Sequence, residues 1–376
     1  MSNTPTREHD LSDLIQAAEG PIRIVGGGTR DIGAPIEGTR VSTAGLSGVT
    51  LYEPGALTLV AKAGTPLEEI DALLAKEGQR LAFEPSDLRG LLGTEGASTI
   101  GGVVATNASG PRRIQVGAAR DFCLGVRFVD GAGRVMKNGG RVMKNVTGYD
   151  LVKLMAGSWG TLGVMTEVSL KVMAIPETET TLVGEGQTAV QAVESLSAAL
   201  GSPFDVTGAA FSEGKTFVRI EGLEASVAYR AGELANGVLA GFQPVSGAAS
   251  SDIWARIRDV NTFADRDGAV WRISVKPSDG PRLVAALEDL APDAIHDWGG
   301  GLVWLHVADQ PDAGAARVRA ELAKLGGHAT LVRAPADVRA SVPVFHPEPA
   351  PIAALTRGLR QKFDPRGILN PGLMGA

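Results

Sequence analysis

The stretch IRIVGGGTRD at residues 22–31 decides how the N-terminal part of the chain folds. Its first four residues predict a short buried strand, which runs directly into three consecutive glycines. Glycines in a row allow backbone N–H groups to converge on an anion, and Thr29 and Arg30 add a hydroxyl group and a positive charge. The stretch lacks the Gly-x-Gly-x-x-Gly and Gly-x-x-x-x-Gly-Lys-Ser/Thr patterns of common nucleotide-binding loops. Taken alone, it is either a phosphate cradle or a tight turn between a strand and a loop.

Two further segments at residues 99–110 and 141–166 combine glycines with small polar side chains. Such segments offer backbone donors without bulky side chains, so they can line a flat aromatic ligand and its linker; the alternative is an ordinary loop. Glycine supplies 49 of the 376 residues, about 13%, which is close to twice the usual ~7%. The glycines cluster without a fixed period, which excludes a collagen-like or low-complexity chain.

Composition and charge restrict the class of protein. Hydrophobic residues make up 44% and charged residues 21%, as in an ordinary globular protein. The net charge of −6 argues against a nucleic-acid partner. The single cysteine, Cys123, cannot form an intramolecular disulfide or supply the four thiolates of an iron–sulfur cluster, so any such cluster must lie in a partner. Residues 1–10 are polar and no run approaches about 18 apolar residues, so we expect a cytoplasmic protein without a membrane span.

A length of 376 residues suggests two domains, or one fold with a large insertion, at roughly 150 residues per domain. In the N-terminal half, apolar periodicity predicts a helix after Asp10 as N-cap and strands over residues 22–25, 57–63, 124–130 and 164–172. A second helix is predicted with Thr65 as N-cap, Pro66 at its first position, Glu68 closing a capping box and Gly78 as the stop.

The C-terminal half alternates strands and helices of about ten residues. Strands are predicted at 178–183, 205–211, 216–221, 269–276, 302–308 and 330–334, and helices at 188–200, 224–239, 281–290 and 312–325. This order is most of a ferredoxin-like unit and then recurs. We therefore place an α+β cap domain at residues 177–341, after a first domain at 1–176. Residues 342–376 contain a predicted helix with Ile352, Leu355, Leu359 and Phe363 on one face, followed by a turn-rich tail.

In their order and separations, these segments resemble the PCMH-type FAD-binding domain of vanillyl-alcohol-oxidase-type flavoproteins, and in particular the FAD-binding subunits of bacterial glycolate oxidases. The resemblance is carried by residues 26–30, 84–85, 99–102, 105–110, 141–150, 157–166, 297–300 and 363–372. It implies an α+β fold, in which a two-part FAD-binding domain carries an α+β, ferredoxin-like cap domain with an antiparallel sheet. It also implies that residues 342–376 return from the cap to the FAD-binding domain.

The resemblance further implies which residues hold FAD. The pyrophosphate would lie on the first glycine loop, the linker and flavin along the second segment, and the adenine end beside the third. The corresponding positions are Gly26, Gly27, Gly28, Thr29, Arg30, Asp31, Pro85, Thr99, Ile100, Gly101, Gly102, Asn107, Ser109, Gly110, Gly163, Val164 and, in the tail, Asn370. We expect non-covalent FAD, because the first loop contains no His and Cys123 lies in an apolar strand.

Related 2-hydroxy-acid dehydrogenases carry a His-x-Gly-Asp-Gly-Asn-x-His segment suited to a metal, and this sequence lacks it. None of the five histidines lies two or four residues from another, so the spacing predicts no metal site. Candidates for a base or a carboxylate-holding cation are His306, Lys144, Tyr149, Arg112 and Arg113. Each has an alternative in ordinary packing, and no catalytic residue is assigned. The cap tryptophans at 271, 298 and 304 either pack in the core or face a flavin or a partner.

The resemblance implies an FAD-dependent oxidoreductase that takes part in oxidising glycolate, a small 2-hydroxy acid, to glyoxylate. A larger FAD-linked glycolate oxidase subunit and an iron–sulfur subunit would be its partners and would receive the electrons. The complex would be cytoplasmic and peripheral at the inner membrane. Two alternatives stay open at this point: a stand-alone FAD-linked dehydrogenase of a 2-hydroxy acid or an alcohol, and a flavin-free structural subunit.

Overall fold

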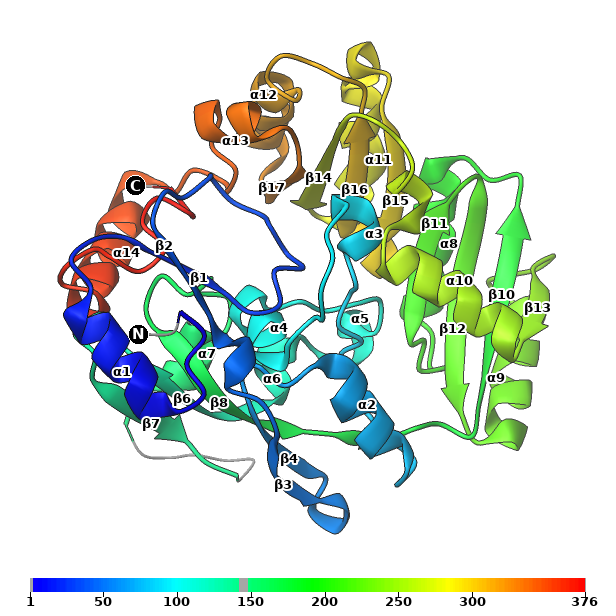
Figure 1. Cartoon of the computed structure of the whole chain (residues 1–376). Coiled ribbons are helices and arrows are strands. Elements are labelled where there is room, and N and C mark those ends of the chain that lie inside the picture. The colour runs from blue at the N-terminus through cyan, green and yellow to red at the C-terminus, as the bar shows by residue number, and fades with distance from the viewer. Residues whose placement is uncertain (1–2, 142–147, 376) are drawn as a thin grey trace.

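The computed structural model describes residues 3–141 and 148–375, and Figure 1 shows the whole chain. The predicted motif segment at residues 141–150 therefore lies mostly outside the described residues, as does Lys144. Two large antiparallel sheets, one from each half of the sequence, form the main bodies of the structure. Among the described residues, no helix combines the length and apolar character needed to cross a membrane.

The N-terminal glycine loop follows a small parallel strand pair. β1 (Ile22–Val25) pairs with β2 (Thr39–Ser42), and β1 coincides with the predicted strand. The preceding helix α1 (Glu8–Ala17) has Arg7 at its N-cap, so the prediction of Asp10 as the cap is wrong. Asp10 lies in the first turn, where its carboxylate pairs with Arg7 at 2.7 Å.

A five-stranded antiparallel sheet forms the core of the N-terminal half. Its strands, in spatial order, are β3 (Val49–Glu53), β4 (Thr58–Lys62), β8 (Val164–Lys171), β6 (Cys123–Val129) and β7 (Val135–Gly139). The helices of this half are α2 (Leu67–Ala75), α3 (Arg89–Leu92), α4 (Ile100–Thr106), α5 (Arg113–Val116), α6 (Ala119–Phe122) and α7 (Leu151–Met155). Apolar side chains of α2, α4, α6, α7 and the sheet form one buried cluster, whereas Leu91 of α3 is buried in the cluster of the cap. A short pair of β5 (Gln79–Arg80) and β9 (Met173–Ala174) completes this half.

The start of α2 differs from its prediction. Pro66 is the N-cap, and no side chain caps the helix. The Thr65 hydroxyl instead donates to the Lys62 carbonyl at 2.7 Å and accepts from the Gly48 amide at 3.0 Å, so a tertiary contact takes the group that a cap would use. Gly78 follows the end of the helix with φ of +61°, as a terminating glycine should.

The cap contains two complete ferredoxin-like units. The first consists of β10 (Thr178–Glu185), α8 (Ala189–Leu200), β11 (Gly208–Ser212), β12 (Lys215–Gly222), α9 (Glu224–Asn236) and β13 (Gln243–Ser246). The second consists of β14 (Ala269–Ser274), α11 (Gly280–Ala286), β15 (Asp293–Asp297), β16 (Leu302–Val307), α12 (Ala315–Leu325) and β17 (His328–Arg333). α10 (Ala248–Arg258) connects them.

The two units join edge to edge into one eight-stranded antiparallel sheet, in the order β13-β10-β12-β11-β15-β16-β14-β17 (Figure 1). The ferredoxin-like antiparallel cap that the sequence predicts is thereby confirmed. The prediction missed β13 and β15 because neither shows clean alternation: β13 is a mostly exposed edge strand containing Pro244, and β15 begins and ends with Asp.

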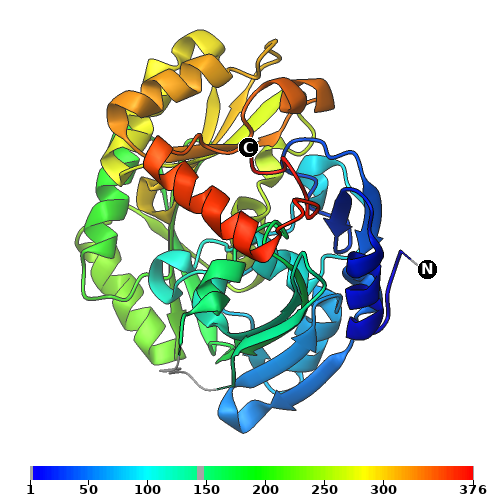
Figure 2. The ribbon, with the colours of Figure 1, turned by 90° about the vertical axis from the view of Figure 1, so that its left-hand side faces the viewer.

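The C-terminal segment returns to the first half. After α13 (Ala336–Ser341), α14 (Ala350–Phe363) lies across the outside of the molecule (Figure 2). The predicted helix is present, but Ile352, Leu355 and Leu359 on its apolar face are exposed rather than packed. The tail beyond α14 then lies beside β1, where the amide of Ile22 donates to the Ile368 carbonyl at 2.7 Å and the amide of Asn370 donates to the Ile22 carbonyl at 3.0 Å.

Candidate functional site

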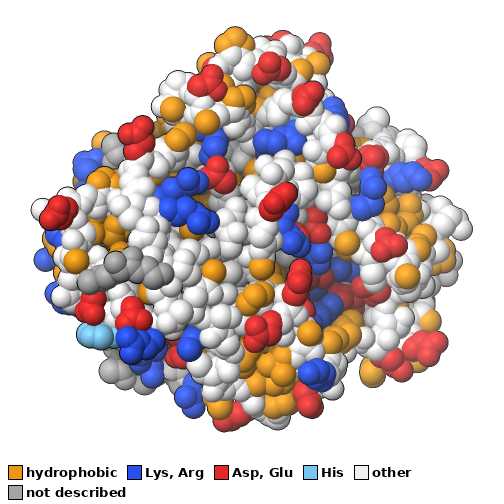
Figure 3. Space-filling model, viewed as in Figure 1, with side chains coloured by type: hydrophobic (Ala, Val, Ile, Leu, Met, Phe, Trp, Pro, Cys, Tyr) orange, Lys and Arg blue, Asp and Glu red, His pale blue; other side chains and the backbone are white. Residues whose placement is uncertain are grey.

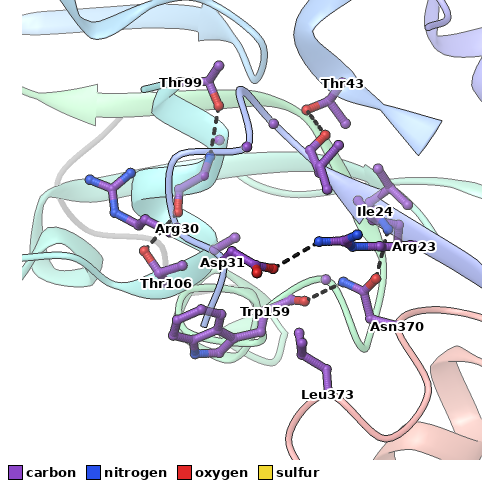
Figure 4. A pocket seen from close by; sticks show the side chains of 18 of the residues that line it. Arg23, Ile24, Arg30, Asp31, Thr43, Thr99, Thr106, Trp159, Asn370 and Leu373 are labelled. Atoms are coloured by element: carbon purple, nitrogen blue, oxygen red, sulfur yellow. Dashed lines mark hydrogen bonds and ion pairs between the residues drawn. The ribbon is translucent and has the colours of Figure 1, made fainter. Parts of the chain in front are cut away.

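An open pocket lies where β1, α4, the loop after α7 and the C-terminal tail meet (Figure 4). Its empty space, together with the solvent at its open mouth, is about 1020 Å³. The walls come from all three glycine-rich segments and the tail: residues 23–32, 34–36, 43, 63, 99, 101, 102, 105, 106, 159, 160, 163–165, 370 and 373.

The first glycine loop presents free backbone donors to this pocket. Among the described residues, the amides of residues 27–31 donate to no protein acceptor. Gly28 has φ of +78°, a conformation that favours glycine, and it turns the loop after β1. Five consecutive free N–H groups beside a cavity form a cradle for an anion such as a pyrophosphate.

Close packing explains why the loop contains glycine. A Cβ on Gly27 would lie 1.7 Å from the Ala97 carbonyl oxygen, and one on Gly26 would lie 2.4 Å from the Thr99 hydroxyl. A Cβ on Gly101 would lie 2.6 Å from the Cβ of Ala63. The loop, α4 and the end of β4 therefore approach one another too closely for any side chain, and this keeps the pocket wall made of backbone.

Arg30 supplies a buried positive charge in the pocket wall. Its guanidinium donates to the Ser98 hydroxyl at 2.8 Å and to the Ser86 carbonyl at 2.5 Å. Burial lowers its pKa to about 10, and the carboxylates of Asp87 and Asp259 oppose that shift. Arg30 thus stays charged at neutral pH, and its Nε has no hydrogen-bond partner in the part of the chain that is described.

Asn370 closes the pocket by bridging two of its walls. Its side-chain oxygen accepts from the Ile24 amide at 2.7 Å, and its side-chain nitrogen donates to the Trp159 carbonyl at 2.8 Å (Figure 4). Asn370 has φ of +44°, which Asn tolerates better than most residues. The indole of Trp159 forms one end of the pocket and packs edge-on against Phe345, with ring centroids 5.2 Å apart.

Asp31 lies in the wall but its carboxylate is already paired. It accepts from Arg23 at 2.9 Å and from Arg339 at 3.1 Å, and Arg339 also donates to the Asp31 and Gly33 carbonyls. The carboxylate therefore fixes the loop to α13, while its backbone amide faces the pocket with its neighbours.

Twelve of the seventeen residues expected to hold FAD line the pocket: Gly26, Gly27, Gly28, Thr29, Arg30, Asp31, Thr99, Gly101, Gly102, Gly163, Val164 and Asn370. The other five do not line it: Pro85, Ile100, Asn107, Ser109 and Gly110. Ile100 is fully buried in the core, and the other members of this group shape the loop after α4 or the segment beside it. For example, the Asn107 side chain accepts from the Arg120 amide at 2.9 Å.

Sequence reasoning did not single out Trp159, although it lies inside the quoted third segment, between Gly157 and Gly160. The glycine-rich segment could have pointed to Trp159, because a large aromatic residue among glycines has few local side chains to pack against. Ile24 and Leu373 were also missed, because an apolar side chain that lines a pocket looks the same in sequence as one in a core.

The candidates for a base or a carboxylate-holding cation differ in their exposure and in the partners that they contact. Tyr149 is 88% exposed. His306 has its Nε2 2.6 Å from the Asp267 carbonyl and its Nδ1 3.3 Å from Arg266. Arg112 is buried in an ion pair with Glu221 at 2.6 Å. Of the candidates that the structure describes, Arg113 keeps a guanidinium free of ion pairs.

The tryptophans of the cap divide between core and interface. Trp271 is fully buried and donates to the Ala313 carbonyl at 2.8 Å, and Trp304 is 5% exposed in the same apolar cluster. Trp298 is only partly buried, and its indole donates to the Gly110 carbonyl at 3.1 Å. Trp298 therefore lies where the cap meets the loop after α4.

The residues of the pocket fit FAD. The free amides of residues 27–31 and the Arg30 charge suit its pyrophosphate, and walls that admit no side chain suit a long, flat ligand. Cys123, the only cysteine, is buried in β6, and burial raises the pKa of its thiol to about 12, so the thiolate needed for covalent attachment is not formed at neutral pH.

Comparison with known proteins gives three kinds of match. The family model of an FAD-binding domain matches residues 3–139. Glycolate oxidase subunit GlcE of Escherichia coli (strain K12) is 36% identical over 346 residues, which cover 92% of this chain and 89% of that protein. Glycolate oxidase subunit GlcD of Bacillus subtilis (strain 168) is 35% identical over 133 residues, which cover 35% of this chain and 24% of that protein.

The fold also matches a solved structure. An alkyldihydroxyacetonephosphate synthase aligns over 98% of this chain and 76% of its own, with a TM-score of 0.69 and 18% sequence identity. This likeness extends through the cap as well as the FAD-binding part. The sequence-based expectation of an FAD-binding, α+β flavoprotein fold with an antiparallel cap is confirmed.

Proposed function

The chain belongs to the family of FAD-linked glycolate oxidase subunits represented by GlcE, and on that basis we propose that it is the FAD-binding subunit of a glycolate oxidase complex. The observation that carries the proposal is the match to GlcE over both halves of the chain, because it includes the cap as well as the glycine loops. The alternative of a flavin-free structural subunit is disfavoured by the five free amides beside the pocket.

In this proposal the FAD-binding domain comprises residues 1–176, the cap residues 177–341 and the returning segment residues 342–376. The amides of residues 27–31 hold the pyrophosphate of a non-covalently bound FAD, and Arg30 neutralises part of its charge. Thr99, Gly101 and Gly102 contact the linker, and Gly163 and Val164 pass the adenine end. Asn370 holds the tail against the pocket wall. The five predicted contacts that do not line the pocket are given no direct contact with the cofactor in this proposal.

The chemistry is the oxidation of glycolate to glyoxylate, which removes a hydride from Cα and a proton from the hydroxyl group. FAD, when bound, supplies the acceptor for the two electrons. The chain itself binds and orients the reactants: the pocket wall fixes the cofactor, and the Trp159 indole, packed against Phe345, forms part of that wall. The electrons then pass to a larger FAD-linked subunit and to an iron–sulfur subunit. This chain has one cysteine, whereas an iron–sulfur cluster usually takes four, and for this reason the cluster is placed in a partner.

An absorption spectrum of the purified chain, before and after anaerobic addition of glycolate, tests the proposal. We expect a yellow protein whose flavin bands stay oxidised until the partner subunits are added, and then bleach. A folded protein that takes up no FAD would contradict the cofactor assignment. Bleaching by glycolate in the lone chain would instead favour the second candidate, a stand-alone FAD-linked dehydrogenase.

The partners and the location need separate measurements. Purification of a tagged chain from cells is expected to bring down a second flavoprotein and an iron–sulfur protein, recognised by their absorption and iron content. We also propose a cytoplasmic location, with attachment to the inner membrane through those partners. Fractionation should then place the chain with the membranes only when the partner subunits are present.

A further inference from the structure

The loop after α4 connects the pocket to a second polar site on the cap. At its start, the Ala105 carbonyl accepts from the amide of Trp159, which forms the end of the pocket. At its far end, the Gly110 carbonyl accepts from the indole nitrogen of Trp298 at 3.1 Å. The surroundings of Trp298 are thus joined to Trp159, one of the residues that line the cofactor pocket, by one short stretch of backbone.

Two arginines from distant parts of the chain share the Trp298 indole. The Cζ atom of Arg113, on α5, lies 4.6 Å from the ring centroid, and that of Arg272, on β14, lies 5.2 Å from it. Arg272 also lies 6.0 Å from the Trp304 ring. Both guanidinium groups are partly buried, so each has lost part of its hydration.

Neither guanidinium has a hydrogen-bond or ion-pair partner among the residues that the structure describes. The nearby carboxylates have other contacts: Asp121 accepts from Lys153 at 3.1 Å, and Asp297 accepts from the Trp298 amide at 2.7 Å. By contrast, the neighbouring Arg112 and Arg219 each pair with a glutamate. The Arg113 and Arg272 charges are therefore left without the counter-charge that partly buried arginines normally have.

The pKa shifts of the neighbouring groups agree with two arginines that lack a full counter-charge. Burial and, to a smaller extent, the positive charge of Arg113 lower the pKa of Arg272 to about 10, against the opposing charge of Asp297. Burial also raises the pKa of Asp297 to about 7, so at neutral pH this carboxyl supplies only part of a negative charge. Both arginines remain protonated at neutral pH, and an anion between them would relieve their repulsion.

We propose that Arg113 and Arg272 bind the carboxylate of a small 2-hydroxy acid over the Trp298 indole. Two guanidinium groups can each donate paired N–H groups to a planar carboxylate, and their stacking on the Trp298 indole holds both in place. This subsite rests on the proposed function, because the acid that it binds is the substrate of the proposed reaction.

The test is calorimetric titration of oxalate, a carboxylate that contains no C–H bond to oxidise, into the FAD-loaded chain. Wild-type protein should bind oxalate. Arg113→Gln and Arg272→Gln should each raise the Kd by about 10- to 100-fold, the loss expected for charge-assisted hydrogen bonds. Arg272→Lys should lie between wild type and Arg272→Gln, because it keeps the charge but loses the fork. Arg256→Gln is the matched control, because Arg256 is 56% exposed and pairs with Glu213 on the cap surface.

FAD content and thermal unfolding are measured on every variant. Since the two arginines have no ion-pair partner, we expect their substitution to leave the Tm within about 4 °C of wild type. Equal oxalate affinity in wild type and both Gln variants, or no oxalate binding by a flavin-loaded wild type, overturns the subsite and leaves the proposed function standing. Arginine-dependent oxalate binding by a chain that takes up no FAD would support the subsite and overturn the proposed function. If Arg272→Gln fails to fold, Arg113→Gln decides the question alone.

Discussion

At the scale of single residues, the pocket depends on glycines that carry no Cβ atom as much as on the side chains that line it. Gly27 has no room for a Cβ beside the Ala97 carbonyl, and the amides of residues 27–31 have no acceptor in the described structure. A substitution there changes the position of the backbone donors, whereas a substitution at an open glycine changes little. The distinction gives a direct test of the loop.

Gly27→Ala is expected to weaken FAD binding by at least tenfold, because a Cβ 1.7 Å from the Ala97 oxygen forces the loop away from α4. Gly20→Ala is the control, since its added Cβ would meet no atom within 4 Å. Fluorescence titration of apoprotein with FAD measures both. Equal affinities of the two variants would show that the loop does not hold the cofactor.

Asp297 provides a second residue-scale prediction, in the pH dependence of stability. Burial raises the pKa of its carboxyl to about 7, against the opposing charges of Arg219 and Arg272, while Glu84 raises it further. The folded state therefore keeps a proton that the unfolded state releases, so this carboxyl removes stability as the pH rises from about 4 to about 7. The slope is at most about 1.4 kcal/mol per pH unit.

Asp297→Asn should abolish this contribution, so the stability of wild type relative to the variant should fall between pH 4 and 7 and level off above 7. The comparison with the variant is necessary because buried His296, whose pKa burial lowers to about 4, acts with the opposite sign between about pH 4 and 6.5. Urea unfolding at half-unit pH steps measures the difference. Parallel curves for the two proteins would refute the raised pKa.

At the scale of elements, the tail and β1 are joined through Asn370. Its side chain satisfies the Ile24 amide and the Trp159 carbonyl, two backbone groups from elements far apart in the sequence. The tail thus completes a wall of the pocket that the N-terminal half begins. Residues that follow α14 along the chain are consequently needed for a site built largely from the first 165 residues.

Asn370→Gly should destabilise the protein by about 2–3 kcal/mol through the two lost hydrogen bonds and should weaken FAD binding. Asn370→Ala should cost about 1 kcal/mol more, because alanine at φ of +44° is strained and glycine is not. The pair of variants separates hydrogen bonding from backbone strain. Urea unfolding and FAD titration check both effects, and a glycine variant that matches wild type in both would refute the bridging role.

At the scale of the whole molecule, a buried ionic cluster connects the FAD-binding part to the cap. Glu221 on β12 pairs with Arg80 at 2.8 Å and Arg112 at 2.6 Å, and Arg219 pairs with Glu84 at 3.0 Å. Figure 3 shows further acidic and basic side chains together on the surface between α2 and the first ferredoxin-like unit. Each ion pair joins the two halves, so the cap is fixed by charges as well as by apolar contact.

Glu221→Gln leaves the guanidinium groups of Arg80 and Arg112 without their carboxylate, and should destabilise the protein by about 3–5 kcal/mol. Glu213→Gln, at an exposed ion pair with Arg256, should cost less than about 1 kcal/mol. The effect at Glu221 should persist in 1 M salt because the pair is buried. Equal midpoints of urea unfolding for the two variants would contradict the role of the cluster.

The sequence by itself determined those features that depend on neighbours along the chain. The strand before Gly26, the glycine-rich segments and the repeated strand–helix order of the cap follow from local periodicity and turn chemistry, and the structure contains them. The weak elements β13 and β15 were missed because edge position and flanking charge remove that periodicity. The N-cap at Thr65 was predicted wrongly because its hydroxyl binds the Lys62 carbonyl and the Gly48 amide instead of the helix.

Only the tertiary structure decided which groups meet and which remain free. The approach of Ala97 to Gly27, the bridge from Asn370 to Trp159 and the pairing of Arg113 with Arg272 over Trp298 join segments far apart in the sequence. A backbone amide or a guanidinium is available to a ligand only if no other part of the fold binds it. That condition depends on the packing of the whole chain, because hydrogen bonds and charges act through space while periodicity acts along the sequence.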